Sequence, residues 1–167
     1  MSKTDENIAA AFAGESQANR KYLAFAKAAD KQGQPQVAKL FRAAAEAETI
    51  HAHGHLKTMG GIGDTLTNLA AAVEGETHEF TTMYPEFIAE AEKEGREDAL
   101  KMFRWANSVE AVHAGLYSKY REALAAGKKL EVKPIWVCTV CGNTFEGQTP
   151  DACPICGTKK AAFTEIK

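Results

Sequence analysis

The chain has 167 residues and a formal net charge of −2, with charges of both signs spread along its length. This length allows one hydrophobic core, or one core and a small second domain. The balanced charge argues against binding to nucleic acid or anionic lipid, and no apolar run reaches the length of a membrane span. The charged first residues, MSKTDENIAAAF, lack the apolar stretch of a secretory signal, which predicts a cytoplasmic protein.

Residues 1–130 predict a four-helix domain. The segment is rich in Ala, Glu and Lys, which favour helix, and Gly127 is a natural stop. Asp64 is a suitable N-cap for the third helix, and Pro85 should end or kink that helix locally. We expect helices over residues 4–32, 35–59, 64–93 and 96–126.

Each expected helix carries an inward-facing apolar stripe at spacings of three and four, the pattern of a four-helix bundle core. Near the middle of every stripe stands a glutamate. A buried ionised glutamate is unfavourable unless it is paired or bound to metal, so four of them predict a cationic centre inside the bundle. Hard carboxylate oxygens together with two imidazoles suit iron or manganese. The four residues are Glu15, Glu48, Glu76 and Glu110.

The same glutamates form two similar sets, each with a Glu-x-x-His pair. The sets are Glu15 with Glu48-x-x-His51, and Glu76 with Glu110-x-x-His113. The two glutamates lie 33 residues apart in the first set and 34 apart in the second. Helix neighbours at i and i+3 share a face, so each pair points both ligands inwards. One Glu from each of two helices and Glu-x-x-His from each of the other two is the arrangement of ferritin-like di-iron proteins. The repetition resembles an internal duplication and predicts two similar metal positions.

Three further histidines are not expected to be ligands. His53 and His55 follow His51 closely, but residues two apart on a helix point in roughly opposite directions. We expect His53 to be exposed and His55 to lie at the core edge. We expect His78 at the surface or behind the ligands.

Residues 134–167 are rich in Pro and Gly and predict a small β domain. Its four cysteines form two tight pairs, Cys138-x-x-Cys141 and Cys153-x-x-Cys156, and the rest of the chain has none. Such pairs, in a chain with no export signal, indicate a metal site in a reducing compartment.

Four thiolates hold either iron or zinc in tetrahedral geometry, and the spacing does not decide between them. Zinc would make a structural, redox-silent ribbon, whereas iron would carry one electron. Trp136, Phe145 and Phe163 should form a small aromatic core. A domain of this size usually needs a metal to fold.

The chain resembles the rubrerythrin family over nearly its whole length, in the stretches AFAGESQANRKY, EAETIHAH, EGETHEFTTMYPEF, SVEAVHA and the CTVCG/CPICG pair. The resemblance implies a mainly α fold, a ferritin-like di-iron bundle followed by a rubredoxin-like domain. It implies two non-haem irons in the bundle and one mononuclear iron on Cys138, Cys141, Cys153 and Cys156. The implied bundle ligands are Glu15, Glu48, His51, Glu76, Glu79, Glu110 and His113.

Several roles come from the resemblance alone. Glu79 matches an additional ligand of the third helix, and Ala18 stands at the equivalent place of the first. On reduction, one iron is expected to exchange Glu79 for His51. Tyr22 and Tyr84 match tyrosines near the irons, whose phenols could bond to ligand carboxylates.

The implied activity is the reduction of hydrogen peroxide to water, in protection against oxidative stress. Electrons would pass through the iron–tetracysteine centre from an external donor, either an NAD(P)H-linked reductase or rubredoxin. Two alternatives stay open: a ferroxidase or iron-storage protein of the ferritin-like class, and a non-enzymatic metal-binding protein with a zinc ribbon.

The link between the second and third helices predicts a domain-swapped homodimer. Ferritin-like bundles place these helices parallel, so one chain closing its own bundle must return about 30 Å. Residues 60–63 span at most about 14 Å. We therefore expect the first two helices of one chain to pair with the last two of another. Unwinding of residues 64–75 would be the other solution.

Overall fold

The computed structural model describes residues 2–167 and divides into two compact units, the first ending at Gly63 and the second beginning at Asp64. No helix within residues 2–167 combines the length and the apolar character needed to cross a bilayer.

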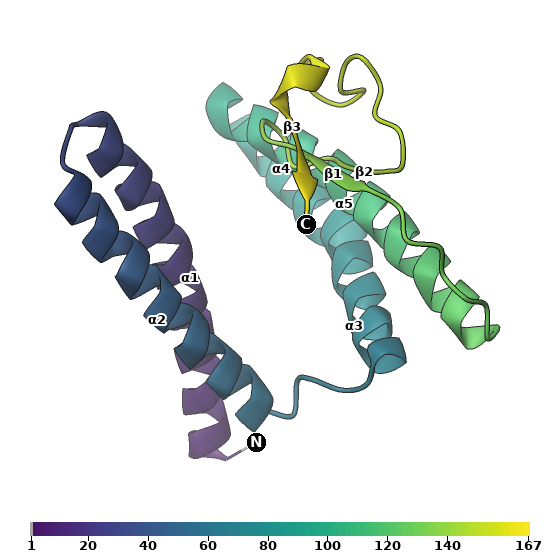
Figure 1. Cartoon of the computed structure of the whole chain (residues 1–167), viewed down its shortest axis with the longest axis horizontal. Helices are drawn as coiled ribbons and strands as arrows, with labels where there is room; N and C mark the ends of the chain where they lie inside the picture. Colours follow the sequence, from purple (N-terminus) through teal and green to yellow (C-terminus); the bar gives the residue numbers. More distant parts are fainter. Residues whose placement is uncertain (1) are drawn as a thin grey trace. The chain divides into compact units, whose positions relative to one another are not determined.

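The first unit is a helical hairpin of α1 (Lys3–Lys31) and α2 (Pro35–Thr58) (Figure 1). α1 begins with a capping box, because the Ser2 hydroxyl accepts the Asp5 N–H and the Asp5 carboxylate accepts the Ser2 N–H. The interface between the helices is built from small side chains, which let the two backbones approach closely. The buried alanines are Ala26, Ala29, Ala38, Ala45 and Ala52.

A polar contact also joins the two helices of this hairpin. The amide nitrogen of Asn19 in α1 donates to the Ala45 carbonyl at 2.7 Å and to the Thr49 hydroxyl at 2.8 Å. The contact fixes the register of α1 on α2 at the level where both helices carry their expected metal ligands.

The second unit begins with three consecutive helical elements, α3 (Thr65–His78), the π-helix η1 (Glu79–Met83) and α4 (Tyr84–Lys93). They pack against α5 (Glu97–Ala125) (Figure 1). The Asp64 side chain accepts the Thr67 N–H at 2.8 Å, so the expected N-cap is confirmed. The expected single α-helix over residues 64–93 is wrong in one respect, because it contains the π-helical segment. Pro85 lies in the first turn of α4, where its missing N–H has no cost.

A small antiparallel sheet follows, with strands β1 (Ile135–Cys138), β2 (Thr144–Glu146) and β3 (Phe163–Ile166) in the order β2-β1-β3. The short helix η2 (Lys160–Ala162) leads into β3. Trp136 pairs with Phe145, whose ring centroid lies 4.8 Å from that of Phe163. These aromatic side chains pack against buried cysteines, which confirms the expected aromatic core.

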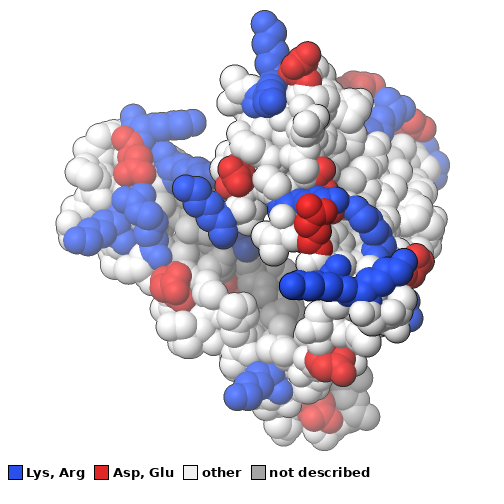
Figure 2. Space-filling view, turned by 45° about the vertical axis from the view of Figure 1, so that its right-hand side comes forward, with Lys and Arg blue, Asp and Glu red and all other residues white. Residues whose placement is uncertain are grey.

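The expected fold class is confirmed: long helices come first and a small three-stranded sheet with four cysteines follows. Lys and Arg side chains stand among Asp and Glu side chains on the face shown in Figure 2. This face carries charges of both signs, as the sequence suggested.

Candidate metal centres

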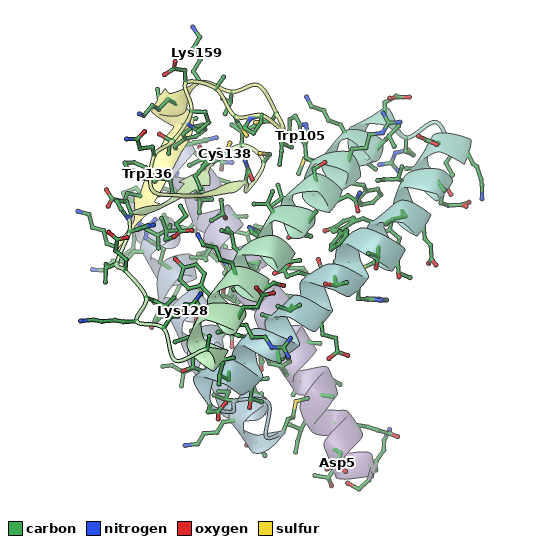
Figure 3. All side chains as sticks on the ribbon, turned by 90° about the vertical axis from the view of Figure 1, so that its right-hand side faces the viewer. Asp5, Trp105, Lys128, Trp136, Cys138 and Lys159 are labelled. Carbon is green, nitrogen blue, oxygen red and sulfur yellow. The ribbon has the colours of Figure 1, made fainter. Side chains whose placement is uncertain are left out.

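The four cysteines converge in the β domain, where Cys138 lies beside the sheet (Figure 3). The sulfurs of Cys138 and Cys156 are 3.7 Å apart, and those of Cys141 and Cys153 are 3.6 Å apart. A metal with bonds to sulfur of about 2.3 Å has tetrahedral edges of about 3.8 Å. The two distances match opposite edges of such a tetrahedron, so the thiols are already arranged for one ion.

The thiols differ in their surroundings. Burial alone would raise the pKa of Cys153, but the N–H groups of Cys156 and Ile155 point at its sulfur, and its pKa is lowered to about 7. Burial raises the pKa of Cys141 and of Cys156. The peptide N–H groups therefore prepare one sulfur for the thiolate form, which is the form that binds metal.

The first hairpin brings together Glu15 from α1 with Glu48 and His51 from α2, with their ligand atoms within 4.8 Å of one another. The Nδ1 atom of His51 lies 2.9 Å from Glu48 Oε2. A first-row metal holds carboxylate oxygen and imidazole nitrogen at about 2.0–2.2 Å, so donors around one ion lie within about 4.4 Å of each other. Small side-chain shifts bring this set to that geometry.

The second unit holds the matching set, Glu76 from α3 with Glu110 and His113 from α5, again with ligand atoms within 4.8 Å. His113 Nδ1 lies 2.8 Å from Glu110 Oε2 and 3.8 Å from Glu76 Oε2. In both sets the Glu-x-x-His pair turns Nδ1 towards the carboxylates. Each unit thus carries half of the expected seven-ligand centre.

Negative charge concentrates in the second set. Burial raises the pKa of Glu76, as do its hydrogen bond with Glu110 and the charges of Glu110 and Glu79, to about 7. Burial and the charges of Glu110, Glu79 and Glu76 also raise the pKa of Tyr84. Three carboxylates and a phenol therefore act on one another here, and a divalent cation would relieve the repulsion.

Glu79 stands outside the tight three-residue set but acts on both Glu76 and Tyr84. It is half-buried and is the first residue of the π-helix η1. The Tyr84 N–H donates to the Glu79 carbonyl, five residues earlier. π-helical turns of this kind inside α-helices occur often at functional sites.

The π-helix explains the unequal spacing of the two sets. Glu15 and Glu76 are 61 residues apart, whereas Glu48 and Glu110 are 62 apart. The second half therefore has one extra residue between its two glutamates, and the wider π turn accommodates one residue more than an α turn. The difference between 33 and 34 residues was the sequence signal for this segment.

The aromatic residues repeat with the same internal distances. Tyr22 packs on Phe25 and Phe41, and Tyr84 packs on Phe87 and Phe103, with centroids 6.1–6.3 Å from the tyrosine. Both tyrosines are half-buried. The contacts extend the internal duplication beyond the ligands.

The other histidines lie where the sequence placed them. His53 and His78 are exposed, and His55 is half-buried. One contact of a ligand was not foreseen: His113 Nε2 lies 2.9 Å from the Thr144 hydroxyl of strand β2. No spacing rule could have found it, because the two residues meet only when the β domain docks on α5.

Family comparisons agree with this organisation. A rubrerythrin family model matches residues 6–121, and a model of the rubrerythrin rubredoxin-like domain matches residues 136–164. Rubrerythrin-1 of Clostridium acetobutylicum is 35% identical over 181 residues, with 96% of this chain and 93% of the relative covered. Nigerythrin of Nitratidesulfovibrio vulgaris is 36% identical, with 98% and 87% covered. A solved structure described as "Fully reduced state of nigerythrin (all ferrous)" has a TM-score of 0.59 at 34% identity, with 99% of this chain and 88% of that chain covered.

Carboxylate–histidine sets on ferritin-like helices, followed by a rubredoxin-like domain with four convergent cysteines, define a metal-binding protein with two kinds of centre. The matches over nearly the full length of the chain show, more narrowly, that it belongs to the rubrerythrin family.

Proposed function

We propose that the chain is a non-haem di-iron peroxidase that reduces hydrogen peroxide to water, with electrons relayed through an Fe(Cys)4 centre. The observation that carries the proposal is the pairing of two Glu/Glu/His sets with a tetrathiolate site in one chain. A storage protein has no need of a one-electron centre, and a structural zinc ribbon has no need of the glutamates. Membership of a family that generally consists of oxidoreductases supports the choice.

The residues would divide the work as follows. Glu15, Glu48 and His51 from one hairpin, with Glu76, Glu110 and His113 from the other, would bind the metal pair, and Glu79 would add a further carboxylate. Two ferrous ions held there supply the two electrons that, with two protons, convert one peroxide into two waters. The phenol of Tyr84, whose pKa is raised by burial and by the nearby carboxylates, keeps its proton at neutral pH and can donate a hydrogen bond to them.

We further propose that the active form is a homodimer with exchanged hairpins. Each unit carries three of the ligands, and the linker of residues 60–63 is short. Stripe residues of both hairpins stay exposed, with Phe25 46% and Phe87 42% accessible. A second copy supplies an apolar surface of the same kind, which would cover them. The thiols and the family suggest a reducing cytoplasm and a separate donor, an NAD(P)H-linked reductase or rubredoxin.

A colour experiment tests the peroxidase proposal. The purified protein is bleached anaerobically with one reducing equivalent per metal, hydrogen peroxide is added, and the red absorption of the oxidised Fe(Cys)4 centre is followed with time. We expect rapid return of the colour in the unchanged protein. The double variant E48A/E110A should recover slowly because its bundle metals are lost.

The matched control is E46A/E122A, which removes exposed glutamates from the same two helices. The control should recover like the unchanged protein. Equal recovery in E48A/E110A would overturn the peroxidase proposal. A colourless protein would indicate zinc in the tetracysteine site, and iron uptake only with dioxygen would favour ferroxidase activity.

A further inference from the structure

Strand β2 lies along helix α5 and touches it at three successive levels within the second unit (Figure 3). A Cβ placed on Gly142 would stand 4.0 Å from Val109 Cγ1. The Thr144 hydroxyl lies 2.9 Å from His113 Nε2. The Glu146 carboxylate accepts a hydrogen bond from Lys119 Nζ.

The two elements match in length over these contacts. Residues 109 to 119 of a helix span about 15 Å, and residues 142 to 146 of a strand span about 14 Å. Gly142, Thr144 and Glu146 alternate along the strand, so they share one face. That face rests on α5.

The opposite face of β2 serves the tetracysteine site. Asn143 is buried and its amide nitrogen lies 3.8 Å from Cys153 Sγ. Phe145 packs on Phe163 in the core that holds the cysteines. The strand therefore contacts the thiolate cluster with one face and a bundle ligand with the other.

The geometry of His113 assigns a role to its second nitrogen. Nδ1 faces Glu110 at 2.8 Å and Glu76 at 3.8 Å, which is the side of the metal set. A metal on Nδ1 leaves the ring proton on Nε2, which can donate to the Thr144 hydroxyl. The Thr144 proton is then free to point towards the Gly142 carbonyl, 3.4 Å away.

We propose that Thr144 is a positioning residue for the metal centre: its hydroxyl accepts the Nε2–H of His113 and so fixes the tautomer and orientation in which Nδ1 binds metal. The inference rests on the proposed function in that it takes His113 as a metal ligand. It adds that the β domain completes the helical metal site through a side chain. Hydrogen bonds of this kind raise ligand basicity and hold the ring in place.

The surroundings strengthen the bond. An apolar cavity lined by Leu69, Leu116, Tyr117 and Ile135 borders His113 and Thr144. A hydrogen bond in such a setting is stronger than one in water, and an unpaired Nε2–H there is unfavourable. His51, the matching histidine of the other hairpin, has a side chain that is 56% exposed, against 25% for His113. The two imidazoles are thus held to different degrees.

The test uses the full-length protein with Thr144→Val, which keeps the shape and removes the hydroxyl, and Thr144→Ser, which restores it. The control is Thr139→Val, because the Thr139 hydroxyl also bonds within the β domain, to the Ala162 carbonyl at 2.8 Å. Zinc serves as a diamagnetic probe of the bundle site. Histidine nitrogen shifts by NMR report the tautomer and the exchange of the Nε2–H, and competition with a chelator reports affinity.

In the unchanged protein we expect zinc to shift Nδ1 of His113 and a slowly exchanging Nε2–H. Thr144→Val should speed that exchange and lower zinc affinity about tenfold or more, Thr144→Ser should restore both, and Thr139→Val should change neither. If Thr144→Val keeps the unchanged exchange rate and affinity, the positioning role is refuted while the metal site stands. If zinc leaves His113 unshifted in the unchanged protein, the ligand assignment under the proposed function fails, and this inference fails with it.

Discussion

At the scale of single residues, the second ligand set is a cluster of like charges that only a cation makes favourable. Glu76 is the clearest case, since burial and its carboxylate neighbours Glu110 and Glu79 raise its pKa to about 7. In the metal-free protein this shift makes stability depend on pH. A carboxyl whose folded pKa lies above its unfolded value of 4.5 favours folding below that value, and the contribution is lost as the pH rises through the folded pKa.

We therefore predict that Glu76→Gln flattens the pH dependence of the metal-free protein. Between about pH 4.5 and pH 7 the unchanged protein should lose thermal stability relative to the variant, because only the unchanged protein must ionise a carboxyl beside other carboxylates. Helix melting followed by circular dichroism after removal of the bundle metals gives the comparison. Glu74→Gln, an exposed change on the same helix, is the control. Parallel pH profiles for Glu76→Gln and the unchanged protein would contradict the prediction.

Residue spacing alone predicted much of each ligand set. The positions i and i+3 share a helix face whatever the tertiary structure, and this is why the Glu-x-x-His pairs could be recognised. Both pairs are found with Nδ1 within 2.9 Å of a glutamate oxygen. The Thr144 contact could not be predicted, because it joins residues 31 positions apart in elements of different type.

At the scale of elements, the hairpin of α1 and α2 depends on close packing of alanines and on one polar bridge. Alanine interfaces bury little apolar area per residue, so specific hydrogen bonds matter for their register. The Asn19 side chain provides two of them, to the Ala45 carbonyl and to Thr49.

We predict that Asn19→Ala destabilises the protein by about 1–2 kcal/mol, the range for losing partly buried hydrogen bonds. Gln17→Ala, an exposed change two residues earlier on α1, should have an effect close to zero. Denaturant unfolding monitored by helix signal measures both. Equal stability of Asn19→Ala and Gln17→Ala would show that the bridge contributes nothing to the hairpin.

The third expected helix shows where pattern analysis stops. Helix formers, the Asp64 cap and the apolar stripe predicted its extent, and the helical elements run from Thr65 to Lys93. The π-helix from Glu79 to Met83 was missed, because one extra residue in a periodic pattern looks like an irregular stripe. The second copy of the ligand set carried the information, since the unequal intervals reveal the insertion.

At the scale of the whole molecule, the exchange of hairpins makes a quantitative prediction. Variants E48A and E110A each lose one ligand from every site when expressed alone. In an exchanged dimer that contains one copy of each variant, one of the two sites combines both defects and the other is intact. With random pairing, about one quarter of the sites should therefore be restored.

Co-expression of the two variants followed by metal analysis measures this restoration, and peroxide consumption provides a second readout. The control is E48A co-expressed with H51A, two changes in the same hairpin, which cannot complement each other in an exchanged dimer. A mixture of E48A and E110A that holds no more metal than either variant alone would exclude the exchange.

The sequence by itself determined the kinds of centre and most of their ligands. Helix periodicity, the repeated Glu-x-x-His pairs and the two Cys-x-x-Cys pairs are local patterns, and local patterns act through backbone geometry that every chain shares. Only the tertiary structure decided that a π turn takes up the extra residue of the second half, and that strand β2 brings Thr144 to His113. Those features depend on how a strand and a helix distant in sequence pack together, and on which turn absorbs an insertion, and neither follows from the spacing of residues along one element.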